Sequence, residues 1–294
     1  MVAATTTALT GLRFGEGPRH GPDGRLWLSD FYAHQVFAID LTTGERETIC
    51  EVPSQPSGLG WLPDGRLLVV SMVDRRVLRR ESDGTLVQHA DLSGIATFHA
   101  NDMLVDPLGR AYVGNFGFDL HEGLDNHGIA GLMDGRITQV PATLALVQPD
   151  GSVSAATSDL AFPNGMVLFG RTLVIAETLA FRLTAFDVAD DGSLSNRRIW
   201  ADLQQHGIAP DGICGDAEGA IWTSSALGSS VFRVTEGGEV TDEVPTSQTC
   251  YAVALTGPER TTLACLTAPD SNPSAVADVE RGAVEVTEVP VPGI

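Results

Sequence analysis

The chain has 294 residues, of which 43% are hydrophobic, and its 38 acidic and 18 basic side chains give a formal net charge of −20. So much negative charge argues against a nucleic acid or an anionic membrane as a partner, because phosphate groups would be repelled. Every basic residue is arginine, which excludes a Schiff-base lysine and the lysine of a phosphate-binding P-loop.

No apolar run approaches the roughly 18 residues that are needed to cross a bilayer. The first residues, MVAATTTALTGLRF, lack the basic start and the long apolar run of a secretory signal peptide. We therefore expect a soluble, cytoplasmic protein without a membrane partner. We expect it to act on a small molecule, as a monomer or a weak homo-oligomer.

One phrase recurs along the chain: an opening residue, a short apolar strand, a turn glycine and a second strand. The copies open, in chain order, at Glu16, Ser57, Asn101, Asn164, Asp211 and Tyr251. In four copies the opening residue lies eight positions before the turn glycine, and these glycines are Gly24, Gly65, Gly109 and Gly219. The copy at Asn164 is two residues shorter, and the last copy has Glu259 where the glycine is expected.

This spacing is typical of a β-propeller, in which each repeat of about 40–50 residues forms one blade of four short strands. In the first repeat the pattern predicts strands over residues 25–30, 36–40 and 45–51, joined by tight turns. We predict an all-β fold, with residues 1–294 as a single domain of six four-stranded blades. Residues 5–13 have no blade of their own, so we expect them to close the ring as the outer strand of the last blade, beside residues 283–289.

The third repeat is longer than the others by about twenty residues, which lie between Asp119 and Thr143. Loops of this length are usually lids or binding loops, and a surface loop without function is the alternative. Ile129, Leu132 and Met133 make the loop more apolar than full solvation requires. No stretch of the chain shows a sustained apolar stripe of helical period, so no helix is predicted.

The inner strands of a propeller run along its central channel, so residues at equivalent strand starts surround one mouth of that channel. Glu16, Asn101, Asn164 and Asp211 would converge there from four blades. Two carboxylates and two amide oxygens suit one hard divalent cation, of which Ca²⁺ is the best match. No histidine belongs to this set, which disfavours a nitrogen-rich Zn²⁺ site, although Zn²⁺, Mn²⁺ or Mg²⁺ could replace Ca²⁺. The alternative is that these residues only begin strands, as turn-forming side chains do.

Four phrases, EGPRHGPDGRLWLSD, HANDMLVDPLGRAYVGN, FPNGMVLFGRTLVIAET and PDGICGDAEGAIW, resemble the SMP-30/gluconolactonase/regucalcin-like family of the sugar-lactone lactonase type. The resemblance covers nearly the whole chain, and the phrases follow one another as they do in the family. It implies a six-bladed propeller with one divalent cation in the channel.

By motif, the resemblance implies that Glu16, Asn164 and Asp211 are the metal ligands. Asn101, from the Asn-Asp phrase, is implied to contact substrate and water close to the metal. Asp119 lies where the sugar-lactone enzymes place an acidic residue that binds substrate. His99 stands where those enzymes carry a substrate-binding arginine, a departure that argues against gluconolactone itself as the substrate.

The function that we predict is a metal-dependent hydrolase that opens the ring ester of a small lactone, either of the sugar type or a secondary metabolite. Asp211 is the candidate catalytic residue, as a metal ligand that could also take the proton of the attacking water. His99, Asn101 and Asp119 are the candidate substrate contacts. Two alternatives remain from the sequence: a phosphotriesterase acting on organophosphates, and a propeller that binds calcium or a ligand without turnover.

Overall fold

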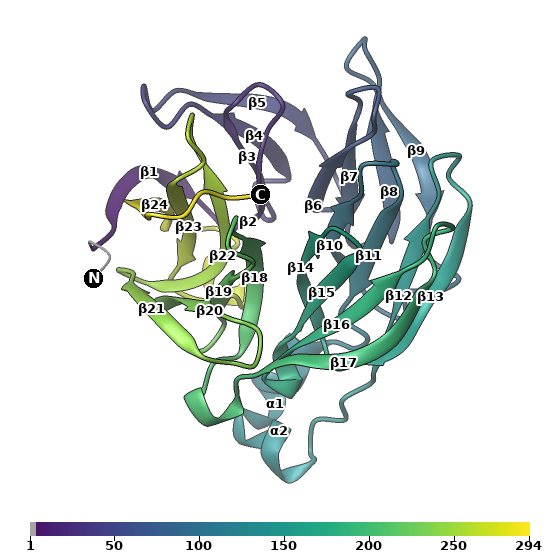
Figure 1. Cartoon of the computed structure of the whole chain (residues 1–294), viewed down its shortest axis with the longest axis vertical. Coiled ribbons are helices and arrows are strands. Elements are labelled where there is room, and N and C mark those ends of the chain that lie inside the picture. Colours follow the sequence, from purple (N-terminus) through teal and green to yellow (C-terminus); the bar gives the residue numbers. More distant parts are fainter. Residues whose placement is uncertain (1–3) are drawn as a thin grey trace.

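The structure is a computed structural model and describes residues 4–294. The chain forms six four-stranded antiparallel sheets arranged around a central channel, as Figure 1 shows. The predicted six-bladed β-propeller is confirmed. In each blade, consecutive strands of the chain lie side by side from the channel outward, and the last blade alone takes a strand from elsewhere.

The strands of the first three blades are β2 (Gly15–His20), β3 (Leu26–Asp30), β4 (Gln35–Ile39), β5 (Arg46–Glu51); β6 (Pro56–Trp61), β7 (Leu67–Ser71), β8 (Arg76–Arg80), β9 (Leu86–Asp91); β10 (Ala100–Val105), β11 (Ala111–Asn115), β12 (Ala142–Val147) and β13 (Val153–Leu160). Those of blades four to six are β14 (Pro163–Phe169), β15 (Thr172–Glu177), β16 (Arg182–Val188), β17 (Leu194–Asp202); β18 (Pro210–Gly215), β19 (Ile221–Ser225), β20 (Ser230–Val234), β21 (Val240–Pro245); β22 (Thr249–Thr256), β23 (Thr262–Ala268) and β24 (Gly282–Glu288).

The ring closes as the sequence predicts. β1 (Thr6–Leu12) pairs antiparallel with β24, with Thr6 opposite Val286, and is the outer strand of the sixth blade. This pairing covers the outer edge of β24 and ties the beginning of the first blade to the last one.

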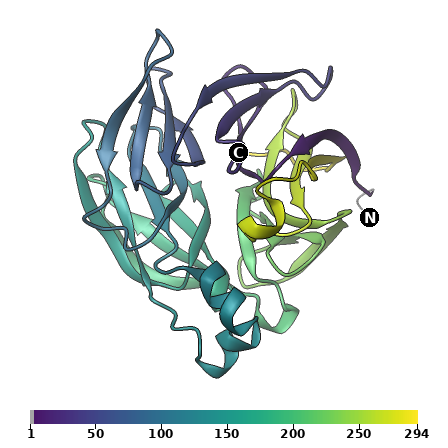
Figure 2. The ribbon, with the colours of Figure 1, turned by 180° about the vertical axis from the view of Figure 1, so that it is seen from behind.

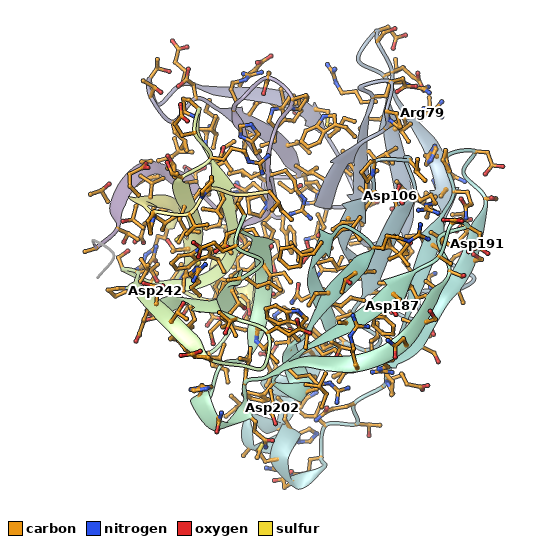
Figure 3. All side chains as sticks on the ribbon, viewed as in Figure 1. Arg79, Asp106, Asp187, Asp191, Asp202 and Asp242 are labelled. Carbon is orange, nitrogen blue, oxygen red and sulfur yellow. The ribbon has the colours of Figure 1, made fainter. Side chains whose placement is uncertain are left out.

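Apolar side chains fill the spaces between neighbouring blades. Trp27 of the first blade meets Trp61 of the second edge to face, with ring centroids 5.5 Å apart. Charged side chains lie mostly outside: Asp191 and Asp202, labelled in Figure 3, are exposed on the hairpin and outer strand of the fourth blade. The large negative charge is therefore carried chiefly by the outer surface, where water solvates it.

The long insertion of the third blade differs from its prediction, because it folds into two short helices, α1 (Leu120–His127) and α2 (Ala130–Asp134). Asp119 caps α1, since its Oδ1 accepts a hydrogen bond from the backbone N–H of Glu122 at 2.9 Å. Figure 2 shows both helices on the face turned toward the viewer. The other helical segments are η1 (Thr178–Ala180), η2 (Gln204–His206) and α3 (Pro273–Val276). Within residues 4–294, no helix has the length and apolarity to span a membrane.

Candidate active site at the channel mouth

Each of the six inner strands breaks its pairing register at the same place. In β2, for example, the regular pairing with β3 is interrupted between Glu16 and Arg19. The corresponding breaks follow Pro56, Ala100, Pro163, Pro210 and Cys250. A bulge of this kind re-aims side chains at the end of a strand. Five opening residues are unpaired at this break, whereas Glu16 is the last residue paired before it, so all six lie at or beside a bulge at one end of the channel.

A chain of hydrogen bonds links these opening residues from blade to blade. The hydroxyl of Ser57 donates to Asn101 Oδ1 at 2.9 Å, and Asn101 Nδ2 donates to Asn164 Oδ1 at 3.0 Å. Asn164 Nδ2 in turn donates to the hydroxyl of Thr178 at 3.3 Å. Asn164 also lies close enough to Asp211 to lower the pKa of its carboxyl group, although burial outweighs this effect. The floor of the mouth is thus a connected polar network in which every amide is oriented by its neighbours.

Two buried carboxylates, Glu16 and Asp211, belong to this floor. Burial, followed by repulsion from Asp211 and Asp102, raises the pKa of Glu16 well above its ordinary value. Burial and repulsion from Asp102 likewise raise the pKa of Asp211. Glu16, Asp102 and Asp211 therefore lie close enough for their negative charges to repel one another, although they come from three different blades.

Asp102 was not singled out in the sequence, and it breaks the pattern of the repeats. The residue after the opening residue is glycine in four blades: Gly17, Gly58, Gly165 and Gly212. There the next blade leaves no room for a side chain, since a Cβ on Gly58 would lie 2.2 Å from the backbone nitrogen of Met103. The third blade carries Asp102 at this position, 2% exposed. Its Oδ2 is buried and has no hydrogen-bond partner among residues 4–294.

These observations fit a bound cation. Glu16, Asp102 and Asp211 are three buried acids, and the one arginine that acts on Glu16 and Asp102 is Arg19. An unpartnered carboxylate oxygen in the protein interior is costly unless a positive charge compensates it. No group of three or more His, Cys, Asp or Glu side chains in the described part of the chain is arranged to hold a metal. The candidate set has only two such residues, because its third member is the amide of Asn164, and oxygen donors of this kind suit hard cations.

Above this floor opens a cavity of about 620 Å³. It brings together every site residue that the sequence predicts: Glu16, His99, Asn101, Asp119, Asn164 and Asp211. It also contains residues that the sequence reasoning missed, among them Thr178, His121 and Ser271, and a large set of aromatic side chains.

The walls of the cavity repeat from blade to blade. In five blades the residue two positions before the opening residue accepts, through its carbonyl, a hydrogen bond from the first residue after the second strand. We call these the mouth pairs: Phe14 with Phe31, Gln55 with Met72, His99 with Phe116, Phe162 with Thr178, and Ala209 with Ala226. These residues lie just outside the inner strands, at the same end as the polar floor. All of them except Ala209 line the cavity.

The insertion of the third blade roofs one part of the cavity. On α1, Asp125 accepts a hydrogen bond from Asn272 Nδ2 at 2.6 Å, and His121 lies 3.4 Å from the hydroxyl of Ser271. Residues 271 and 272 belong to the sixth blade, which is opposite the third in a ring of six. Helix α1 and this loop of the sixth blade therefore meet at the mouth.

His99 lies at this rim, stacked on Phe98 with ring centroids 4.1 Å apart. Burial lowers its pKa, and the nearby charge of Asp119 only partly opposes that effect. Burial also lowers the pKa of His121. Both imidazoles are therefore neutral at pH 7 and offer one donor and one acceptor each.

Comparisons of sequence and of structure both find proteins of one family. The family model described as SMP-30/Gluconolactonase/LRE-like region matches residues 14–269. Regucalcin of Danio rerio is 29% identical over 199 residues, which span 67% of this chain and 59% of regucalcin. Pentonolactonase XacC of Haloferax volcanii is 27% identical over 91% of this chain and 86% of its own length. The crystal structure of a calcium-binding protein, regucalcin, from Agrobacterium tumefaciens superimposes with a TM-score of 0.76 at 21% identity, covering 99% of this chain and 97% of that one.

Proposed function

We propose that this chain, which belongs to the SMP-30/gluconolactonase/LRE-like family, is a metal-dependent hydrolase that opens the ring ester of a small lactone. The observation that carries the proposal is the floor of the cavity. There Glu16, Asn164 and Asp211 converge beside an unpartnered carboxylate oxygen of Asp102. The pentonolactonase that matches this chain nearly end to end supports the reaction. The calcium-binding regucalcin with the same fold supports the choice of Ca²⁺.

Glu16, Asn164 and Asp211 would hold the cation through oxygen. When bound, a divalent cation polarises the lactone carbonyl and stabilises the negative charge that develops on its oxygen. Asn101 fixes the amide of Asn164 through their hydrogen bond and lines the cavity, where it would contact the substrate. His99 and Asp119 lie at the rim and would contact the part of the substrate that does not react.

Asp211 would accept the proton of the attacking water. Direct metal ligation lowers the basicity of a carboxylate, whereas burial raises the pKa of Asp211, so the two effects oppose each other. The water oxygen bonds to the carbonyl carbon, the ring C–O bond breaks, and the ring oxygen leaves with a proton. One lactone and one water yield one hydroxy acid.

A phosphotriesterase is the second candidate function, because the aromatic walls of the cavity would also accept an aryl phosphate ester. The third is a propeller that binds calcium without turnover, as the similarity to a calcium-binding regucalcin allows.

A substrate panel separates these candidates. Purified protein is loaded with Ca²⁺, Zn²⁺ or Mn²⁺, assayed on five- and six-membered lactones and on paraoxon, and assayed again after EDTA treatment. We expect lactone hydrolysis that EDTA abolishes and added metal restores. Hydrolysis of paraoxon alone would favour the phosphotriesterase, and metal binding without any turnover would favour the binding protein. Activity that survives complete metal removal would contradict the proposed mechanism.

A further inference from the structure

The mouth pairs are far more apolar than the floor beneath them. They contain four phenylalanines and one methionine, and His99 is their one titratable group. Burial lowers the pKa of His99, so it is uncharged at pH 7. A substrate bound on the polar floor is therefore surrounded by side chains that make van der Waals contacts and few hydrogen bonds.

The aromatic side chains form two walls. The first wall belongs to blades one and six and consists of Phe14, Phe31, Tyr32 and Tyr251, in which Phe14 and Tyr251 have ring centroids 4.8 Å apart. The second wall consists of Phe116 of the third blade and Phe162 of the fourth, stacked at 4.8 Å with only 7° between their planes. Blades one and four, and blades three and six, are opposite in a ring of six, so the two walls face each other across the channel.

The position of Phe162 is maintained against a local cost. Its backbone has a φ of 60°, in the left-handed region that bulky side chains rarely adopt. Strained backbone of this kind persists where the surrounding structure fixes it, often at binding sites. Here it places a flat ring directly beside Asn164 of the floor.

Three polar groups near the rim already have partners within the protein. Asp119 Oδ1 caps α1, and Asp125 accepts a hydrogen bond from Asn272. The hydroxyl of Tyr32 donates to the carbonyl of Ser271 at 3.1 Å. A polyhydroxylated lactone brings several hydroxyls that each need a partner once they leave water, and a binding site that leaves them unpaired loses affinity.

The mouth pair next to Asp211 has the smallest side chains, Ala209 and Ala226, and of these Ala226 lines the cavity. The other mouth pairs narrow the cavity with larger side chains. This asymmetry leaves room for the reacting ester beside Asp211 and places the rest of the substrate between the two aromatic walls.

We infer that the substrates are lactones with an aromatic ring fused or attached to the lactone ring, and that the two walls bind this ring. The inference rests on the proposed lactonase function and names its substrate class. It does not depend on which divalent cation is bound.

The test compares dihydrocoumarin with D-glucono-1,5-lactone, because both have a six-membered lactone ring and only the first carries an aromatic ring. With metal-loaded protein we expect kcat/KM for dihydrocoumarin to exceed that for gluconolactone by about tenfold or more, the difference that a few aromatic contacts supply. The hydrolysis product 3-(2-hydroxyphenyl)propanoate should inhibit competitively, whereas gluconate should not.

Phe116→Leu removes one ring of the second wall and keeps an apolar side chain. It should lower kcat/KM for dihydrocoumarin by about three- to tenfold more than kcat/KM for gluconolactone. Phe232→Leu, in β20 and outside the cavity, is the matched control and should change neither. A wild type that prefers gluconolactone, or a Phe116→Leu variant that loses both activities equally with an unchanged melting temperature, overturns the inference and leaves the lactonase proposal standing. If the metal-loaded protein hydrolyses neither lactone, the inference is wrong. If it also hydrolyses no other lactone of the panel, the lactonase proposal is wrong as well.

Discussion

Asn101 donates a hydrogen bond to Asn164 across the boundary between the third and fourth blades, with Nδ2 and Oδ1 3.0 Å apart. The same Asn101 accepts from Ser57 of the second blade. One amide therefore joins the polar floor over three blades. It also fixes the direction of the Asn164 side chain, which is a proposed metal ligand.

Asn101→Ala should weaken metal binding although Asn101 is not a proposed ligand. Groups that orient a ligand through a hydrogen bond commonly contribute about 10–100-fold to metal affinity. Isothermal titration of the metal-free protein with Ca²⁺ measures the effect, and Ser57→Ala should produce a smaller loss by the same route. An unchanged affinity in Asn101→Ala would show that Asn164 does not depend on this contact.

Asp211→Asn should abolish turnover, because it removes a ligand charge and the proton acceptor together. Metal analysis of the dialysed protein should show reduced occupancy, and the melting temperature of the metal-free variant checks that it folds. Full occupancy with full activity would exclude Asp211 from both roles.

His99→Ala and Asp119→Asn should keep the metal and change which lactone is preferred. Both residues line the cavity at the rim, above the floor, so they can contact the substrate without reaching the ion. Lost ground-state contacts chiefly raise KM, whereas damage to the chemical step lowers kcat. Loss of metal from Asp119→Asn, or kinetics unaffected by His99→Ala on every substrate, would contradict this division of roles.

Asp102→Asn should act in opposite directions on the two forms of the protein. In the metal-free form it removes a buried carboxylate whose Oδ2 has no partner, so the melting temperature should rise, by roughly 2 °C or more. In the metal-bound form it removes a negative charge near the cation, so the Kd for Ca²⁺ should increase by about tenfold. Glu122→Gln, at the exposed rim, is the control for a general charge effect. A fall in the melting temperature of metal-free Asp102→Asn would instead assign Asp102 a purely structural role.

Stabilisation by Ca²⁺ should grow with pH. The pKa values of Glu16 and Asp211 are raised in the folded chain by burial and by repulsion from neighbouring acids. Without metal, the folded state keeps protons that the unfolded chain releases at about pH 4. The free energy of unfolding therefore falls as the pH rises from there through the folded-state pKa values. A bound cation holds both groups ionised and removes this loss.

The measurement is the increase in melting temperature on adding Ca²⁺, compared at about pH 5 and about pH 8. We expect the larger increase at the higher pH. In Asp211→Asn the difference between the two pH values should shrink, since one of the two titrating acids is gone. Equal increases at both pH values in the wild type would mean that Ca²⁺ binds elsewhere.

The fold could be predicted because the repeated phrase fixes both the strands and their register. The same alignment brought Glu16, Asn101, Asn164 and Asp211 to one mouth, where the structure also places them. Their roles as ligands and substrate contacts stay predictions. The helices of the insertion were missed because α1 is only eight residues long, too short for a periodic stripe. Its signal was local: Asp119 followed three residues later by Glu122, the spacing of a capping box.

The aromatic walls were missed for another reason. The opening residues lie in the inner strands, whereas the residues two positions before them lie just outside those strands. Phe14, His99 and Phe162 occupy this position in three repeats, but strand alternation does not predict where their side chains point, and Phe162 has a φ of 60°. The contacts of α1 with Ser271 and Asn272 could not be predicted this way, because they join segments about 150 residues apart through loops outside the repeats.

Because β1 pairs with β24, the propeller cannot close until β24 has been synthesised. β1 is synthesised before every other strand of the propeller, and its partner β24 is synthesised after all of them. During synthesis the backbone groups of β1 facing that partner remain unpaired, and the first and last blades cannot yet meet. The first aromatic wall joins Phe14 of the first blade to Tyr251 of the sixth, so half of the cavity cannot exist in a partly synthesised chain. Binding of a cation or a substrate is thus tied to the arrival of the C-terminal strand, and the nascent chain must stay free of competing strand pairings until then.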